Sequence, residues 1–105
     1  MSPEEFDEII IASNKFYGRR NRQNKVIEEC GELIQGIAKF QAINPQPNTK
    51  EDIDMIDHIC QEIADVEIVL ASYKKYLPTN VLEKFKDQKI TRLKLRLSEN
   101  IISSK

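Results

Sequence analysis

The chain has 105 residues, enough for one small domain, and 40% of them are hydrophobic, which favours a globular fold over a disordered one. Sixteen Lys and Arg residues nearly balance 17 Asp and Glu residues, so bulk charge favours neither nucleic acid nor an acidic membrane as partner. No apolar run approaches the ~20 residues of a membrane helix, and the acidic N-terminus lacks the basic stretch of a signal peptide. We therefore expect residues 1–105 to form a single cytoplasmic domain that binds neither membrane nor nucleic acid.

Proline and glycine positions divide the chain into four predicted helices. Residues 2–5 combine a Ser cap, a Pro in the first turn and a Glu three residues after the Ser, which is typical of a helix start. This first helix is expected to end before Gly18. The second helix is predicted over about 21–43, because apolar residues recur there at spacings of three and four. These residues are Val26, Cys30, Leu33, Ile37 and Phe40.

The second half of the chain is predicted to hold two more helices. Residues 44–48 contain two prolines, which cannot occupy a helix interior, so this segment is expected to be a loop. A Thr followed three residues later by an Asp then starts a third helix, expected over about 50–77 and ended by Pro78. A fourth helix is predicted over about 80–99, with 101–105 as a loose tail.

The third predicted helix is apolar on more than one side. Met55 and Ile59 share one side, whereas Ile53, Ile68 and Ala71 lie on another. A helix of this kind is central in its fold or lies at a subunit contact. Four short helices can scarcely cover both sides, so we predict an all-α, four-helix bundle that is completed by oligomerisation.

Two pairs of carboxylates, each spaced by three residues, lie on the second and third helices: Glu29 with Glu32, and Glu62 with Asp65. Residues three apart on a helix are neighbours, so each pair points to one side. Glu29 and Glu62 have apolar neighbours one turn away, so the pairs are expected to face each other across the packed seam. Four clustered negative charges need protons or a metal ion, and an all-oxygen set suits Mg²⁺ or Mn²⁺. The alternative is a solvated acidic stripe on an amphipathic bundle.

Other residues near these acids have more than one interpretation. Gly36 stands on the same side as the first pair, one turn beyond it, where a bare helix side leaves room for a ligand. His58 lies one turn before the second pair and is predicted to be a surface histidine, with a ligand role as the alternative. Cys30 and Cys60 lie on separate helices without C-x-x-C spacing, so buried, reduced thiols are predicted rather than a zinc site.

The residues around the acids resemble a known family. The stretches EECGEL (28–33) and EIADVE (62–67) are similar to the E-x-x-E and E-x-x-D motifs of MazG-like all-α nucleoside triphosphate pyrophosphohydrolases, and the resemblance covers about residues 17–96. It implies a Mg²⁺-dependent attack of water on the α-phosphorus, which yields a nucleoside monophosphate and pyrophosphate. It also implies a homodimer or homotetramer. Carried over by position, the metal-binding and catalytic residues are Glu29, Glu32, Glu62 and Asp65.

The resemblance gives the basic residues a candidate role in binding the nucleotide. Lys25 lies one turn before Glu29, so it is predicted to contact a phosphate or to form a salt bridge within its own helix. Three basic residues follow one another at spacings of three and four on the fourth helix. They are predicted to hold the β- and γ-phosphates, with a solvated basic face as the alternative. These residues are Lys89, Arg92 and Arg96.

Three functions are therefore carried forward from the sequence. The first is a Mg²⁺-dependent nucleotide pyrophosphohydrolase that converts a (deoxy)nucleoside triphosphate to the monophosphate and pyrophosphate. The second is phosphoribosyl-ATP pyrophosphohydrolase, an enzyme of the same superfamily. The third is a non-catalytic helical module for oligomerisation or regulation, in which the acids form only a solvated stripe.

Overall fold

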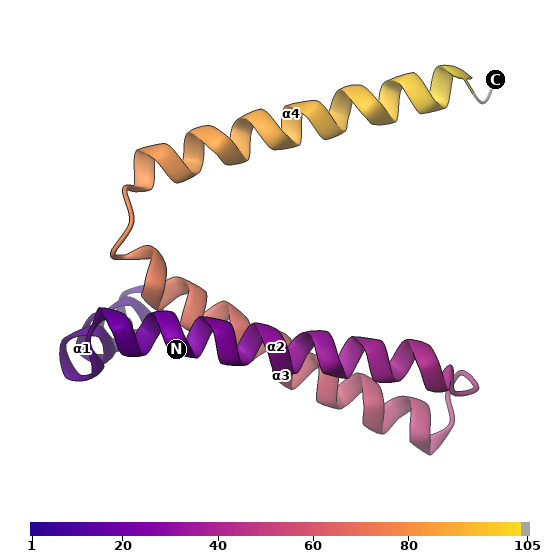
Figure 1. The fold of residues 1–105 in the computed structure, drawn as a ribbon, viewed down its shortest axis with the longest axis horizontal. Coiled ribbons are helices and arrows are strands. Elements are labelled where there is room, and N and C mark those ends of the chain that lie inside the picture. Colours follow the sequence, from indigo (N-terminus) through magenta and orange to yellow (C-terminus); the bar gives the residue numbers. More distant parts are fainter. Residues whose placement is uncertain (104–105) are drawn as a thin grey trace.

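The computed structural model describes residues 1–103, and side chains as far as Ile101, as four helices joined by short connections (Figure 1). No strand occurs within this range, so the predicted all-α class is confirmed. None of the helices over residues 1–103 is long and apolar enough to cross a membrane. The helices are α1 (Pro3–Tyr17), α2 (Arg19–Ile43), α3 (Lys50–Lys74) and α4 (Thr79–Ser103).

Side-chain caps start two of these helices as the sequence predicted. The Ser2 hydroxyl accepts a hydrogen bond from the Glu5 amide at 3.0 Å, and the Thr49 hydroxyl accepts one from the Asp52 amide at 3.2 Å. The Asp52 carboxylate in turn accepts the Asn48 amide at 3.0 Å. These bonds satisfy amides that have no partner within the helix, so they fix where α1 and α3 begin.

Two predicted helix ends were wrong. α3 ends at Lys74, because residues 75–77 form tight turns whose amides bond carbonyls three residues back. α4 continues through residues 101–103, which were predicted to be a loose tail, while 104–105 lie outside the described residues. No proline or glycine follows Pro78 in the sequence, so nothing local ends the last helix earlier.

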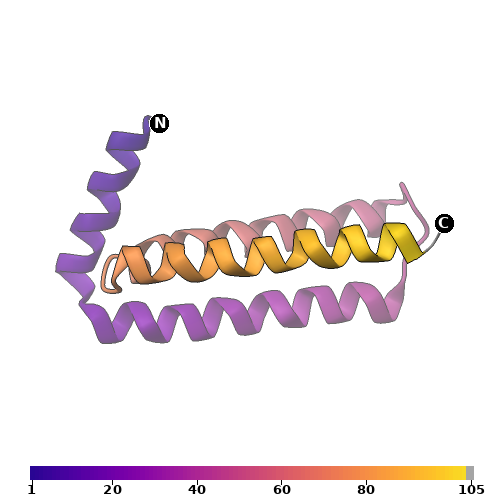
Figure 2. The ribbon, with the colours of Figure 1, turned by 90° about the horizontal axis from the view of Figure 1, so that it is seen from above.

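The α2–α3 hairpin is the main packed unit of the chain. The two helices have 25 residues each and run antiparallel along their length (Figures 1 and 2). α1 crosses one end of this hairpin and contacts both of its helices. Each 25-residue helix is about 37 Å long at 1.5 Å per residue, so the hairpin is a rod and not a sphere.

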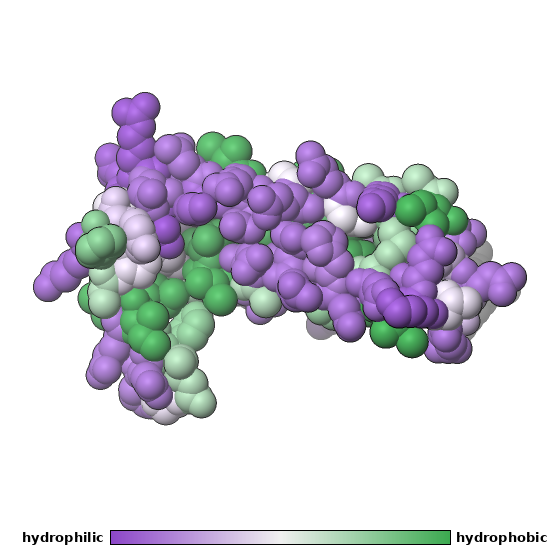
Figure 3. Space-filling view, turned by 90° about the horizontal axis from the view of Figure 1, so that it is seen from below, coloured by the Kyte–Doolittle hydropathy of each residue, from purple (hydrophilic) through white to green (hydrophobic). Residues whose placement is uncertain are grey.

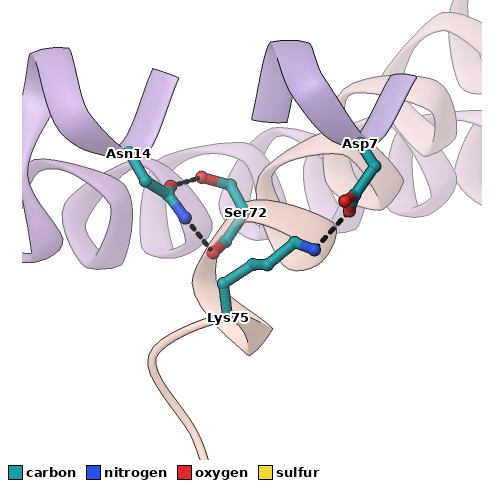
Figure 4. Close-up of polar contacts among 4 residues, drawn as sticks. All are labelled: Asp7, Asn14, Ser72 and Lys75. Atoms are coloured by element: carbon teal, nitrogen blue, oxygen red, sulfur yellow. Dashed lines mark hydrogen bonds and ion pairs between the residues drawn. The ribbon is translucent and has the colours of Figure 1, made fainter. Parts of the chain in front are cut away.

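Polar contacts attach α1 to the end of α3 (Figure 4). The Asn14 side chain donates to the Ser72 carbonyl at 3.0 Å and accepts from the Ser72 hydroxyl, and Ser72 is fully buried. Lys75, just beyond α3, forms an ion pair with Asp7. The Tyr76 hydroxyl donates to the Asn14 carbonyl at 3.1 Å. α1 therefore holds both the end of α3 and the first residues of the connection to α4.

α4 stands apart from the other three helices. It points antiparallel to α3 but diverges from the hairpin, and it makes no extensive contact with any other helix (Figures 1 and 2). The radius of gyration is 18.1 Å, against about 13 Å for a compact chain of this length. One chain alone does not close the predicted four-helix bundle, and its completion by oligomerisation stays a prediction.

The apolar core of a single chain is small. Among the described side chains, Ile10 and Val69 are the only hydrophobic ones that are buried. Apolar side chains gather in the corner between α1 and the hairpin, and others interrupt the polar surface elsewhere (Figure 3). Core burial of this extent is far below what normally offsets the chain entropy of a 105-residue domain.

Candidate metal centre

The antiparallel packing of α2 and α3 places the two acidic pairs at the same height along the hairpin axis. Each of three side chains contributes one carboxylate oxygen, and these oxygens lie within 4.8 Å of one another. The three residues are Glu29 and Glu32 of α2 and Glu62 of α3. Asp65 is not part of this compact set, although its negative charge acts on Glu29. The expected meeting of the two pairs is thus found for three of the four acids, with the fourth close by.

Two carboxylate oxygens in this cluster are buried without a hydrogen-bond partner among the described residues. They are Oε2 of Glu29 and Oε2 of Glu62. Glu62 as a whole is only 8% exposed, and Glu29 is half-buried. A buried carboxylate oxygen without a donor has lost its hydration without compensation, an arrangement that normally carries a free-energy penalty. The donor set is all oxygen and negatively charged, so it fits a hard divalent cation.

The pKa of Glu29 reflects this environment. Burial raises the pKa of the Glu29 carboxyl above its ordinary value, and the neighbouring charge and hydrogen bond of Glu32 raise it further. Asp65 and Glu28 act in the same direction through their charges. Every one of these effects disfavours the ionised carboxylate, so a nearby cation would be stabilised by this position.

A cavity opens directly beside the acids. It has a volume of about 610 Å³, within the usual range for small-molecule sites. Gly36 forms part of its wall, and a methyl group placed there would lie 3.7 Å from the nearest atom of His58, an ordinary contact. The cavity thus adjoins Gly36, but a side chain there would touch His58, and the expected room for a ligand beside Gly36 stays a prediction. The remaining lining residues are Glu32, Gln35, Lys39, Asp54, Met55 and Glu62.

Lys39 was not singled out from the sequence, and Met55 was named there only as an apolar residue of the third helix. Lys39 lies seven residues after Glu32, and Met55 lies seven before Glu62, so both share a helix side with an acid. This seven-residue spacing from an acid is the feature of the sequence that could have identified them as cavity residues. His58 is exposed, as predicted, but its Nε2 lies 3.4 Å from a carboxylate oxygen of Glu62. It therefore also helps to fix the position of that acid.

The basic residues are distributed differently from the expectation. Lys25 forms a salt bridge with Glu28 at 3.1 Å, one of its two predicted interactions, while a phosphate contact stays a prediction. Lys89, Arg92 and Arg96 all lie on α4, which does not pack against the helices that carry the acids. In the single chain α4 is directed away from those helices, so a phosphate contact of its basic residues stays a prediction (Figure 1).

The two cysteine thiols differ in how far they are buried. Both are free, with Cys30 half-buried, but Cys60 is exposed on α3, so the expectation of two buried thiols was wrong for Cys60. The apolar positions around Cys60 are themselves exposed in one chain, which explains the difference. No group of His and Cys ligands that could hold zinc occurs in the described part of the chain.

Comparison with family models, with curated proteins and with solved structures finds no match for this chain. The geometry of the acids and of the adjoining cavity therefore carries the functional argument.

Proposed function

We propose that the chain is a Mg²⁺-dependent nucleotide pyrophosphohydrolase, which splits a (deoxy)nucleoside triphosphate and water into the monophosphate and pyrophosphate. The observation that carries the proposal is the pair of buried carboxylate oxygens without partners, in a cluster of three acids beside an open cavity. A solvated acidic stripe has no reason to bury two such oxygens. The motifs EECGEL and EIADVE, which resemble those of the MazG-like family, favour this reaction among those that use a divalent cation.

In this proposal the chain's own groups hold the cation and place the substrate. Glu29, Glu32, Glu62 and Asp65 are the ligands, and Mn²⁺ is an acceptable replacement because it prefers the same oxygen donors. When bound, the cation supplies charge neutralisation for the phosphate oxygens and activation of water. The cavity beside the acids receives the nucleotide, and it is large enough for a ligand of that size.

The proposal includes basic residues and an assembly. Lys25 is assigned to the substrate together with Lys89, Arg92 and Arg96, because a triphosphate needs positive charge beyond what the cation provides. The α4 residues belong to a helix that does not reach the acids of its own chain. The enzyme is therefore proposed to be a homodimer or homotetramer. A reducing compartment such as the cytoplasm fits its two free thiols.

A pyrophosphate-release assay tests the reaction. Purified protein is incubated with each of the common nucleoside triphosphates and their deoxy forms, with millimolar Mg²⁺ or with a chelator. We expect pyrophosphate and the monophosphate in equal amounts with Mg²⁺, and none with the chelator. Release of orthophosphate instead would contradict cleavage at the α-phosphorus. Absence of any product from the whole panel, with phosphoribosyl-ATP included, would reject the enzyme assignment in favour of a non-catalytic module.

A further inference from the structure

The apolar side of α4 has no partner helix within one chain. Leu82, Ile90, Leu93 and Leu97 lie within about 80° of one another around the helix axis at 100° per residue, and we call these four the α4 face. One charged residue, Lys86, lies within the same arc. Ile90 is 61% exposed and Leu97 is 53% exposed. A lone helix of this length is only marginally stable in water and depends on packing of its apolar side. The α4 face therefore needs a cover.

α3 carries a matching row of apolar residues, which we call the α3 row. Its members recur at spacings of three, four and three, the spacing of a seam between packed helices. All four are exposed in the single chain. They lie away from the side that packs on α2, where Glu62, Val66 and Val69 are found. The α3 row consists of Ile53, Ile56, Cys60 and Ile63.

The connection between α3 and α4 keeps these two surfaces apart in one chain. Lys75 is paired with Asp7 (Figure 4), and Tyr76 is bonded to Asn14, so α1 holds the first two residues of the connection. Pro78 follows at once and α4 begins at Thr79. Only a few residues separate the attached segment from α4, which leaves α4 directed away from α3 of its own chain (Figure 1).

Charge favours one partner for α4. α4 contains six Lys or Arg residues and three Asp or Glu residues, so it is basic. α3 contains seven acidic residues and two basic ones, whereas α2 contains five basic and three acidic. Pairing α4 with another α4, or with α2, brings together helices of like sign. Pairing it with α3 brings together opposite signs, which is the favourable arrangement between packed surfaces.

The surface area indicates that another copy is needed. The chain exposes 8558 Å², whereas a compact monomer of 12.2 kDa exposes about 6,100 Å². The excess of roughly 2,500 Å² is about three times what one partner buries in a standard stable interface. In a reciprocal exchange, each of two chains places its α4 on the α3 row of the other chain. Such a dimer covers the α4 face and the α3 row of both chains.

We infer that α4 is an exchanged helix, whose α4 face docks on the α3 row of a second copy of this chain. The inference does not depend on the proposed reaction, since it uses only apolar surface, charge and the attached connection. It also gives the exposed thiol of Cys60 a place inside the interface, among the isoleucines of the α3 row.

Substitutions on two sides of α4 test the docking. Leu93→Glu places a charge on the α4 face, whereas Leu95→Glu places the same charge on a different side of the same helix, where Leu95 is already 59% exposed. We expect light scattering to give at least a dimer for the unaltered chain and for Leu95→Glu. Leu93→Glu is expected to shift the mass to 12.2 kDa, the mass of one chain. A monomeric unaltered chain, or equal masses for the two variants, would overturn the inference.

Cysteine cross-linking identifies the partner surface even where Leu93→Glu fails to fold. With Cys30→Ser as background, Ile90→Cys, Leu93→Cys and Leu97→Cys are each oxidised in the presence of the native Cys60. We expect a reducible dimer for at least one of them and none for the matched control Leu95→Cys. The dimer should vanish when Cys60→Ser is added. A dimer that persists without Cys60 means that α4 pairs with α4, and no dimer at any position means that α4 is not docked; both reject the inference.

Discussion

α3 and α4 each have 25 residues, but only α3 packs extensively against other helices of the chain. α3 packs along α2, buries Glu62 and Val69, and is attached to α1 through Ser72. α4 has no fully buried residue among its described side chains, and its apolar residues are spread over a mainly polar surface. The hairpin alone holds the acids together, whereas α4 makes no extensive contact within the chain and is proposed to act through assembly. Chemistry at the acids and assembly through α4 are therefore separable by mutation.

The largest expected effect concerns the hairpin. Glu62→Gln keeps the size of the side chain but removes one charge from the cluster. We expect kcat/KM for nucleotide cleavage to fall at least ~100-fold, which corresponds to about 2.7 kcal/mol of transition-state stabilisation. In the presence of a chelator the variant should melt at the same temperature as the unaltered chain or higher, because a charged oxygen that is buried without a hydrogen-bond partner is gone.

The matched control is Glu51→Gln, which removes an exposed acid in the first turn of the same helix. Its kinetics should match those of the unaltered chain, with a loss of at most a few tenths of a kcal/mol from the helix terminus. Activity of Glu62→Gln equal to that of this control would remove Glu62 from the metal site.

Substitution of Arg92 tests whether α4 contributes to substrate binding at the acidic site of another copy of the chain. Arg92→Ala is expected to lower kcat/KM for a triphosphate at least tenfold, about 1.4 kcal/mol, while the mass in solution stays unchanged. Lys94→Ala removes the same charge from the opposite side of α4 and should have no such effect. α4 does not reach the acids of its own chain, and the α3 row on which it is inferred to dock lies on the side of α3 away from Glu62. A contribution of Arg92 to the site therefore requires a further chain, as in a homotetramer, and mixing Arg92→Ala with the inactive Glu62→Gln should then restore part of the activity. No recovery in the mixture would contradict a contribution from the partner chain.

Metal binding should stabilise the hairpin by a comparable amount. Mg²⁺ at ten times its dissociation constant adds about 1.4 kcal/mol to the free energy of unfolding, which raises the melting temperature by roughly 5–10 °C for a chain of this size. Differential scanning fluorimetry with Mg²⁺, Mn²⁺ or an equal ionic strength of NaCl measures this shift. A rise with NaCl of the same size would mean general screening of charge and not a specific site.

The smallest effect follows from the raised pKa of Glu29. The folded chain binds a proton at this carboxyl more tightly than the unfolded chain, whose pKa is near 4.5. Without metal, the stability that this group contributes is present below that value and is lost as pH rises through the raised pKa. Glu29→Gln removes this dependence, so its stability relative to the unaltered chain should increase from pH 4.5 towards neutral pH in a chelator. Urea titrations across this range measure the difference, and a constant difference would contradict the assignment.

Much of the hairpin could be predicted from the sequence because its determinants are local. The caps at Ser2 and Thr49, the two prolines of the loop and the apolar spacing set helices that the structure contains at nearly the expected places. Glu29, Glu32 and Glu62 come together because an antiparallel hairpin with a short loop has few ways to align its apolar sides. The burial of Glu62 followed from its apolar neighbours.

The position of α4 could not be predicted in the same way. It depends on contacts between residues far apart in the chain, such as Asp7 with Lys75 and Asn14 with Tyr76, which no spacing in the sequence reveals. The cavity beside the acids could also be predicted only in part from the sequence. Gly36 indicated open space, but the roles of Lys39 and Met55 as its walls depend on the alignment of α2 with α3.

The attachment of residues 75 and 76 to α1 also sets the helical phase of α4. Each residue turns an α-helix by about 100°, so one residue inserted between the attached segment and Thr79 rotates the side that α4 presents by that amount. Such an insertion would turn Leu93 away from the α3 row of the partner chain and place a different side of α4 there. The loop at 44–48 has no comparable constraint on what lies beyond the hairpin. Variation in length is thus tolerable at one connection and disruptive at the other, although both are short turns between helices of equal length.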